Sequence, residues 1–442
     1  MAQSFDSITP VLTKLYIPGV EPYTWSEDFV TTMLEKRERV EQVGYEFNVK
    51  VQSGFSEGVK NLASAVAALP DARQNQYKNY NGTVKTIAGR IKLFNTLMDY
   101  IDSDPNRVLD AAGDEIIGVR EVLKCENERQ VIGDAGATHL CTVASAAVTN
   151  ETDTWVTVVV NNDAAALCGP TYPTRYLRNG MIIDILAANH ASVSTTDTES
   201  LEIGDVVDDV TFTIKCATNA AADTLAALLA DGQLIYHEDG YNNEFYGLKS
   251  LFGSTTNTIF DVDRTTTPNA YLKPRVTYVD SSGRLITGAP TGTNTDAWSC
   301  VNVHQMISYL VNTNHASKKD LAIVCEEGVK AAYIQKKKAE NGYFIEGKKI
   351  DGWDYEVIEA EGVTLSDAKY MVSNAMCFVP LNKLKKYLNR KVDFRYTRDN
   401  SIWAPVSGYD AQEAYMIGTH QFGCENFKHG GWMGDLKGQY DQ

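Results

Sequence analysis

The chain has 442 residues, of which 43% are hydrophobic and 22% are charged, and its formal net charge is −16. This length allows two or three domains with a large core, and the composition is ordinary for a soluble globular protein. The acidic balance argues against a dedicated nucleic-acid binder, because such proteins usually present a basic surface.

The beginning of the chain, MAQSFDSITP, lacks the basic and apolar regions of a secretory signal. No run approaches the roughly 18 apolar residues that a membrane span needs, so no membrane partner is expected. Cysteine occurs at positions 125, 141, 168, 216, 300, 325, 377 and 424, without a CxxC pair. This scatter predicts reduced cysteines in a protein made in a cytoplasm-like compartment.

The first predicted helix covers residues 25–42, WSEDFVTTMLEKRERVEQ, which carry a thin apolar stripe. A strand is predicted at 45–51, and residues 77–95 alternate between apolar and polar side chains, as a strand does. Two strands joined by a long polar excursion predict an extended hairpin arm. Such an arm buries little surface by itself, so it implies a partner.

The clearest helix is predicted over residues 103–134, where Asp104 can cap the N-terminus and Pro105 suits the first helical position. Apolar residues recur on one face at helical spacing: Val108, Ala112, Ile116, Val119 and Leu123. At 1.5 Å per residue the helix would be about 40 Å long, which indicates a structural spine.

Residues 138–243 are rich in small residues and turns, with strands predicted at 154–160, 180–186 and 209–215. We interpret this region as an inserted β-rich domain. A loop-like stretch is predicted over 253–297.

An α/β passage follows, with a helix at 301–312, a strand at 321–325 and a helix at 326–340. Strands are predicted again at 392–400 and 414–427. Two basic clusters, Lys336–Lys337–Lys338 and NKLKKYLNRK (382–391), are interpreted as solvated helix faces.

Two short patterns resemble catalytic or phosphate-binding motifs. GFSEG (54–58) matches the G-x-S-x-G nucleophile elbow around Ser56, but the preceding strand is half polar, whereas an elbow follows a buried strand. GYFIEGKK (342–349) resembles a P-loop, but Lys349 stands where the magnesium-binding Ser or Thr is needed. We interpret the first as a loop and the second as a short strand between turns.

The stretch HQFGCENFKHGGW (420–432) gathers two His, a Cys and a Glu, as a metal site would. In a strand, His420 and Cys424 would lie about 13 Å apart, too far to share a zinc ion. We therefore expect ordinary strand residues, with Phe422 and Phe427 packed inward or against a neighbour and Gly430–Gly431 turning the chain. No catalytic, cofactor-binding or metal-ligating residue is predicted, and the chain is not expected to be an enzyme.

The order of segments resembles that of the major capsid proteins of tailed bacteriophages, which have the Hong Kong 97 fold. The resemblance lies in ALPDARQNQYKNYNGTVKTIAGRIKLFNTL, in DGQLIYHEDGYNNEFYGLKSLFG, in DLAIVCEEGVKAAYIQ and in the closing segment from VDFRYTRDN to GGWMGDL. It implies an α+β fold with a spine helix, an extended E-loop, an N-terminal arm, axial and peripheral domains, and an inserted β-rich domain.

The resemblance also implies a division of the chain. Its parts would be the N-terminal arm (1–44), the E-loop (45–84), the peripheral domain with the spine helix (85–137), the inserted domain (138–243), a connecting segment (244–295), the axial domain (296–380) and the closing strands of the peripheral and axial domains (381–442).

The function implied is self-assembly into hexamers and pentamers of an icosahedral phage head that encloses double-stranded DNA without sequence-specific binding. Scaffold, portal and cement or decoration proteins are further implied partners. The implied location is the virion, after assembly in the host cytoplasm. Two alternatives stay open: an encapsulin-type nanocompartment shell with the same fold, and a serine hydrolase that uses Ser56.

Overall fold

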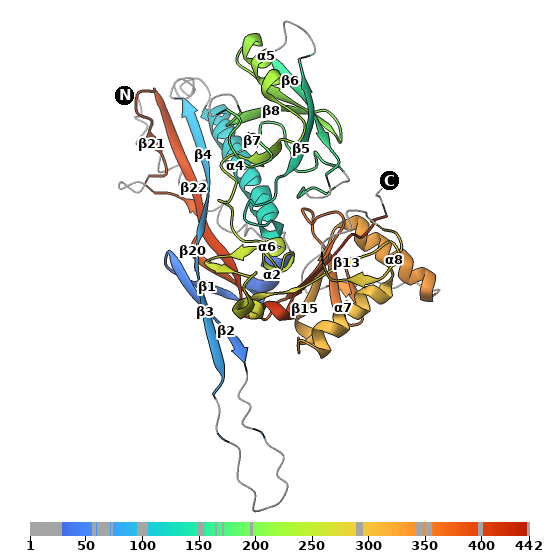
Figure 1. Cartoon of the computed structure of the whole chain (residues 1–442). Helices are drawn as coiled ribbons and strands as arrows, with labels where there is room; N and C mark the ends of the chain where they lie inside the picture. The colour runs from blue at the N-terminus through green and yellow to red at the C-terminus, as the bar shows by residue number, and fades with distance from the viewer. Residues whose placement is uncertain are drawn as a thin grey trace, which may run out of the picture.

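The computed structural model describes residues 29–54, 59, 71, 74–94, 105–148, 154–163, 166–169, 172–194, 198–288, 295–341, 348–349, 356–396 and 401–439. The fold is α+β, and Figure 1 shows four parts: a projecting hairpin, a central sheet beside a long helix, a barrel, and a second sheet with two helices. The hairpin pairs β2 (Glu46–Gly54) with β3 (Gln76–Thr83) and confirms the base of the predicted arm. The strand predicted at 77–95 is divided, however, because residues 85–94 pair with residues 411–420 of the central sheet.

The central sheet has five strands, and its axis is β22 (Ala411–Cys424), in agreement with the strand predicted at 414–427. β22 pairs antiparallel with β20 on one side and with β4 on the other. The remaining bounds are β1 (Val40–Gln42), β4 (Lys85–Phe94), β20 (Leu384–Phe394) and β21 (Ala404–Pro405).

The N-terminal helix is shorter than predicted. α2 (Phe29–Lys36) is buried along its apolar face, and the predicted start at 25–28 lies outside the described residues. Glu38 adopts a left-handed φ of 54°, which ends the helical path. Residues 40–42 then form β1, parallel to β20, so the prediction of helix beyond Lys36 was wrong.

The basic stretch 382–391 was also predicted wrongly, because it forms most of β20 and not a helix face. Lys386 is only 7% exposed. The ammonium group of Lys385 lies 3.0 Å from Glu41 and 3.0 Å from Glu425. Ion pairing with neighbouring elements therefore neutralises lysines that the sequence suggested were solvated.

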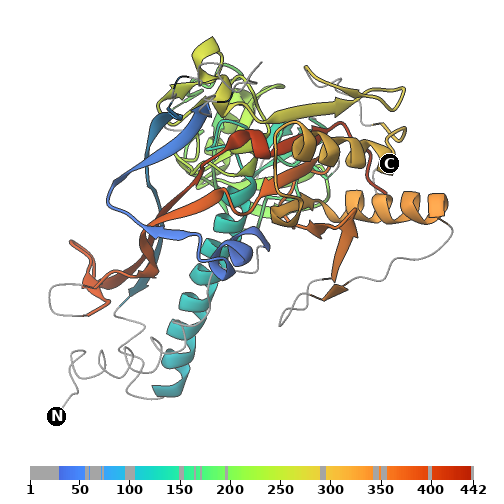
Figure 2. The ribbon, with the colours of Figure 1, turned by 90° about the horizontal axis from the view of Figure 1, so that it is seen from below.

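The long helix predicted over 103–134 is confirmed as α4 (Pro105–Ile132), although its proposed cap, Asp104, lies outside the described residues. α4 packs on β4 at Gly89, where a Cβ atom would come within 2.7 Å of Leu123. Glycine is needed there because the helix approaches the strand so closely. Figure 2 shows α4 running outward as a single rod, away from the two helices within residues 300–341.

The predicted β-rich region contains a closed antiparallel barrel with the strand order β10-β5-β6-β9-β8-β7. Its side chains alternate between a buried interior and a polar exterior, and its closure leaves no free strand edge. The strands predicted at 154–160, 180–186 and 209–215 are present. The bounds are β5 (Cys141–Ala147), β6 (Trp155–Asn161), β7 (Ile182–Leu186), β8 (Leu201–Val206), β9 (Thr211–Lys215), α5 (Asn219–Leu228) and β10 (Leu234–His237).

The chain enters and leaves the barrel through two segments, 136–140 and 235–242, which lie side by side and which we call the neck. Gly136 has a φ of 74°, and a Cβ atom there would lie 1.9 Å from the carbonyl oxygen of Gly240. The backbone N–H of Asn242 donates to the carbonyl of Gly136. Only glycine permits this contact.

The stretch predicted as loop-like, 253–297, is more structured than expected. It contains β11 (Thr258–Ile259), β12 (Val262–Asp263), η2 (Thr267–Leu272), β13 (Arg275–Val279) and β14 (Leu285–Ile286). β13 pairs in parallel with a strand at the far end of the chain, β23 (Gly431–Gly434). Such pairing between distant segments gives no local sequence signal, because its partner is more than 150 residues away.

Arg264 holds the first residues of the 253–297 stretch against the end of the preceding helix. Its fully buried guanidinium donates to the carbonyls of Leu251 (2.8 Å) and Ser254 (2.8 Å), at the C-terminal end of α6 (Leu248–Phe252). Burial lowers the pKa of Arg264 to about 9. The carbonyl groups at a helix end favour a cation, so the residue remains a suitable cap.

The second sheet has eight strands in the order β14-β13-β23-β19-β15-β18-β17-β16. Two helices share a hydrophobic core with it: α7 (Cys300–Asn312) and α8 (Glu327–Asn341). These elements confirm the predicted helices at 301–312 and 326–340 and the strand at 321–325. The other bounds are β15 (Leu321–Cys325), β16 (Lys348–Lys349), β17 (Glu356–Ala360), β18 (Val363–Asp367), β19 (Met376–Pro380), η3 (Lys318–Asp320) and η4 (Phe427–His429).

Candidate assembly surface

The projecting hairpin is anchored to the body through one of its two faces. Phe47 of β2 stacks on Tyr387 of β20 with ring centroids 4.1 Å apart, and Tyr80 of β3 stacks on Phe260 at 5.0 Å. These rings come from four segments that are far apart in sequence. The base of the hairpin is therefore held firmly by aromatic packing.

Tyr80 adds two hydrogen bonds at the same place. Its hydroxyl donates to the carbonyl of Cys424 and accepts from the N–H of Cys424, both at 2.9 Å. Burial raises the pKa of Tyr80 well above its usual value, so the hydroxyl keeps its proton and can donate. The hairpin is thereby tied to the end of β22, the axis of the central sheet.

We expect Tyr80→Phe to lower the free energy of unfolding by about 1–3 kcal/mol, because two buried backbone groups lose a partner. The midpoint of denaturant unfolding would measure this loss. Tyr45→Phe is the matched control, since Tyr45 is 71% exposed and should tolerate the change. Equal midpoints for the two variants would contradict the anchoring role of the Tyr80 hydroxyl.

The opposite face of the hairpin is polar and exposed. Cross-strand pairing places Asn48 opposite Asn81, and the two amides are hydrogen-bonded at 2.6 Å. Tyr77, which is 60% exposed, lies farther out, opposite Gln52. Within the described residues β2 and β3 form a two-stranded sheet, so each strand has one edge without a strand partner.

A two-stranded ribbon with open edges is marginally stable in water and is suited to pairing with another chain. Exposed tyrosine is also enriched among residues that contribute most to protein–protein binding. The exposed face and edges of the hairpin thus form the candidate assembly surface. The polar character of that face argues against nonspecific aggregation of the free subunit.

The stretch 420–432 has the predicted strand character at its two ends, in β22 and β23, while Phe427–His429 form η4, and its residues contact different partners. The backbone N–H of Cys424 donates to the hydroxyl of Tyr80, whereas the carboxylate of Glu425 forms ion pairs with Arg39 (3.1 Å) and Lys385 (3.0 Å). Phe422 and Phe427 are buried within the subunit, in its main core. Across the part of the chain that the structure describes, no three His, Cys, Asp or Glu side chains gather as metal ligands would.

The two glycines of this stretch have a different role from the one predicted. A Cβ atom on Gly430 would lie 2.3 Å from the ring of Phe252, and one on Gly431 would lie 2.2 Å from Met306. Gly431 begins β23. These glycines therefore permit close packing, and the prediction that the pair turns the chain was wrong.

His420 is fully buried between aromatic rings, with its ring centroid 4.6 Å from that of Phe245. Burial, reinforced by the charge of Lys386, lowers the pKa of His420 well below its usual value. The folded subunit therefore holds a neutral imidazole that the unfolded chain would protonate below about pH 6.5.

The stability contributed by neutral His420 should be complete above about pH 6.5 and should decline as the pH falls, by up to about 1.4 kcal/mol per pH unit. Stability falls toward low pH because the unfolded chain binds a proton at His420 that the folded subunit does not bind. Unfolding of wild type and His420→Gln, measured between pH 7.5 and about 5, would test this. A variant with an unchanged pH slope would contradict the assignment.

The other sequence motifs give no candidate site. Ser56 and residues 342–347 lie outside the described residues, so the structure does not address the nucleophile elbow or most of the P-loop-like stretch. Lys348–Lys349 form β16, consistent with a short strand. Lys336 lies on α8, where it pairs with Asp296 at 2.8 Å. No described helix is long and apolar enough to cross a membrane.

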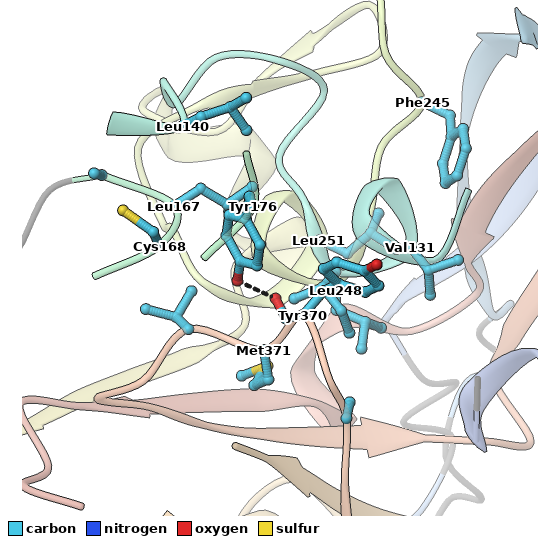
Figure 3. Close-up of a cluster of buried hydrophobic side chains, with 14 of the residues drawn as sticks. Val131, Leu140, Leu167, Cys168, Tyr176, Phe245, Leu248, Leu251, Tyr370 and Met371 are labelled. Carbon is cyan, nitrogen blue, oxygen red and sulfur yellow. Dashed lines mark hydrogen bonds between the residues drawn. The ribbon is translucent and has the colours of Figure 1, made fainter. Parts of the chain in front are cut away.

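The barrel is fixed to the body by a packed junction, drawn in Figure 3. Tyr176 of the barrel donates to the carbonyl of Tyr370 at 2.5 Å, and their rings lie among apolar side chains from both parts. Arg178 lies 3.6 Å from Glu126 of α4. Hydrophobic packing and charge together set the orientation of the barrel.

A buried ion network lies beside this junction. Arg129 of α4 donates to both Glu126 and Glu244. Burial alone would raise the pKa of Glu126, but the charge of Arg129 lowers it overall. Burial and the charge of Glu126 raise the pKa of Glu244 in spite of Arg129. The Glu126–Arg129 spacing of one helical turn was visible in the sequence, whereas Glu244, 115 residues away, was not.

At the level of sequence, no family profile and no curated protein matches the chain. Among solved structures, the chain is similar to one from the capsid asymmetric unit of cyanophage A-1(L), with a TM-score of 0.51 and 11% identity, over 93% of this chain and 94% of that chain. A chain from the capsid of the native GTA particle has a TM-score of 0.42 and 11% identity, over 92% of this chain and 90% of that chain.

A chain from the holo-encapsulin complex of Synechococcus elongatus has a TM-score of 0.40 and 7% identity, over 91% of this chain and 88% of that chain. The cyanophage likeness extends over nearly all of both chains. The chain has the α+β fold of the tailed-phage major capsid proteins, the Hong Kong 97 fold.

Proposed function

We propose that this chain is a major capsid protein, which assembles as hexamers and pentamers into the icosahedral head of a tailed bacteriophage around double-stranded DNA. The observation that carries the proposal is the projecting hairpin. Its base is anchored by Phe47 and Tyr80, while each of its two strands has one edge without a strand partner among the described residues. The likeness to the cyanophage capsid chain supports the same function.

The mechanism proposed is association of many copies. The E-loop (45–84), which includes the hairpin, lies over a neighbouring subunit, and the N-terminal arm (1–44) contacts adjacent subunits. Strand edges gain backbone partners from neighbours, as in strand addition. Symmetric closure then hides edges that would otherwise promote aggregation. In this proposal the chain is not an enzyme, and it acts in the virion after assembly in the host cytoplasm, with scaffold, portal and decoration proteins.

Electron microscopy of the expressed and purified chain tests the proposal, with uniform closed shells as the expected result. Disordered aggregates or monomers at all concentrations would contradict it. The contents of particles from the natural source distinguish the alternatives: packaged DNA supports a phage head, and a cargo enzyme supports an encapsulin-type shell. Esterase activity that is lost in Ser56→Ala would instead support a hydrolase.

A further inference from the structure

Three connecting segments lie side by side where the second sheet joins the central sheet, and we call them the connector surface. They are residues 313–320, 381–385 and 425–430. The side-chain amide of Asn314 donates to the carbonyl of Lys428 at 2.5 Å, which joins the first segment to the third. The backbone N–H of Glu425 donates to the carbonyl of Lys383 at 2.8 Å, which joins the third segment to the second. Residues that are distant in sequence are thus held on one continuous surface.

The connector surface is basic, although the chain as a whole is acidic. Its three segments contain five lysines and two acidic residues, a net charge of +3, whereas the net charge of the chain is −16. Both acidic residues are engaged in ion pairs. Asp320 pairs with Arg37 at 2.7 Å, and Glu425 pairs with Arg39 at 3.1 Å and with Lys385 at 3.0 Å. An excess of positive charge therefore remains on this surface.

The lysines and histidines of the connector surface lie close to one another. Burial lowers the pKa of His429, and the charges of Lys383 and His315 lower it further, so these three groups are near enough to repel one another. Lys428 precedes His429 in η4 and is exposed. Among the described residues, neither Lys383 nor Lys428 forms an ion pair with a carboxylate. Positive groups that are not balanced within the subunit attract an anion to this place.

The choice of anion rests on the proposed function. Duplex DNA carries one negative charge per about 1.7 Å of its axis, and lysine side chains bind its phosphates without reading the bases. In a shell of the proposed kind, packaged DNA is also the polyanion to which every copy of the subunit is exposed. A local excess of positive charge can contact DNA even though a chain with a net charge of −16 is not a dedicated nucleic-acid binder.

We propose that the connector surface faces the interior of the shell and binds phosphate groups of the packaged DNA through Lys383 and Lys428, with His315 and His429 beside them. The contact is independent of base sequence. Each subunit supplies only a few positive charges, so the genome is held weakly at many equivalent points. The acidic remainder of the subunit limits the total attraction.

Chemical crosslinking of DNA-filled particles from the natural source tests this placement. Formaldehyde joins lysine amines to DNA bases that lie in close contact with them, and mass spectrometry of the digested protein identifies the lysines. Peptides that contain Lys383 and Lys428 should carry nucleotide adducts. Adducts confined to other lysines would overturn the inference and leave the proposed function intact. Particles that contain no DNA would overturn the proposed function itself.

Binding of a fluorescently labelled DNA duplex to purified subunits gives an independent measurement. Lys383→Gln combined with Lys428→Gln should weaken binding and reduce the slope of log affinity against log salt concentration by about two, one for each lost phosphate contact. The matched control is Lys50→Gln combined with Lys391→Gln, which removes two exposed lysines outside the connector surface. Equal losses in the two double variants would overturn the inference, because the net charge alone would then explain the binding.

Competition identifies the class of partner. Unlabelled duplex DNA should displace the labelled duplex more effectively than inorganic phosphate or polyglutamate at the same concentration of charge, because its phosphates are closely and regularly spaced. Inorganic phosphate that competes equally well would assign the surface to free phosphate, and polyglutamate that does so would assign it to an acidic protein. Either result, or no DNA binding by the wild-type subunit at low salt, would overturn the assignment to DNA.

Discussion

Replacing residues 53–76 with an Asn-Gly turn is expected to abolish shell formation while the subunit remains folded. The turn would join Gln52 to Tyr77, which already face each other across the hairpin, and Asn-Gly is the preferred two-residue connection. The anchoring residues Phe47 and Tyr80 stay in place, so the core is retained. Only the outer part of the candidate assembly surface is removed.

Sedimentation and electron microscopy of the truncated chain would measure assembly, and thermal unfolding would show whether the subunit is intact. Tyr77→Ala keeps the hairpin at its full length and removes one exposed side chain, so its effect on assembly should be smaller than that of the truncation. It should raise the concentration needed for assembly by about tenfold or more, as expected for loss of an interface tyrosine. Normal shells from the truncated chain would refute the role of the hairpin in assembly.

Arg129→Met should cause the largest loss of stability, about 3–5 kcal/mol, because two buried carboxylates would lose their shared cation. Glu126 and Glu244 both depend on Arg129 and are almost fully buried. The loss should be localised to the junction between α4, the neck and the barrel. Denaturant unfolding would measure the loss of stability. Faster amide hydrogen exchange at residues 234–248 would show that the loss is localised to this junction.

Two comparisons make this prediction specific. Adding Glu126→Gln and Glu244→Gln to Arg129→Met should restore much of the lost stability, because no unpaired charge then remains buried. Lys215→Met removes an exposed ion pair and should change the free energy of unfolding by less than about 1 kcal/mol. An Arg129→Met effect no larger than that of Lys215→Met would contradict the role assigned to the network.

Much of the fold could be predicted from periodicity along the chain. The 28 residues of α4 and the strands of the barrel have apolar residues at helical or alternating spacing, so their local signal is strong. β13 and residues 384–391 of β20 were missed because their character depends on distant partners: β23 for the first, and β1 with β22 for the second. The strand predicted at 392–400 covers only the last three residues of β20. The many charged side chains of β20 also obscured the alternation between buried and exposed residues that indicates a strand.

The assembly surface was only partly predictable. Alternation at 77–95 and the polar excursion before it predicted an arm that needs a partner. The anchor could not be predicted, because Tyr80, Phe260 and Tyr387 meet only in the folded subunit. In the apparent ligand stretch 420–432, His420 and Cys424 were correctly placed in one strand, β22, whereas Phe427–His429 form the 3-10 helix η4 in place of the predicted strand.

The neck has a consequence for engineering and for evolution. Because Gly136 and Gly240 touch, the backbone could pass from one to the other with almost no intervening chain. The barrel between them is closed, so its covalent attachment to the subunit is confined to the neck, and the contacts of Tyr176 and Arg178 with the body add to it. Another small domain whose termini lie equally close together could occupy that point, and an assembly of the proposed kind would then contain one copy of it in every subunit.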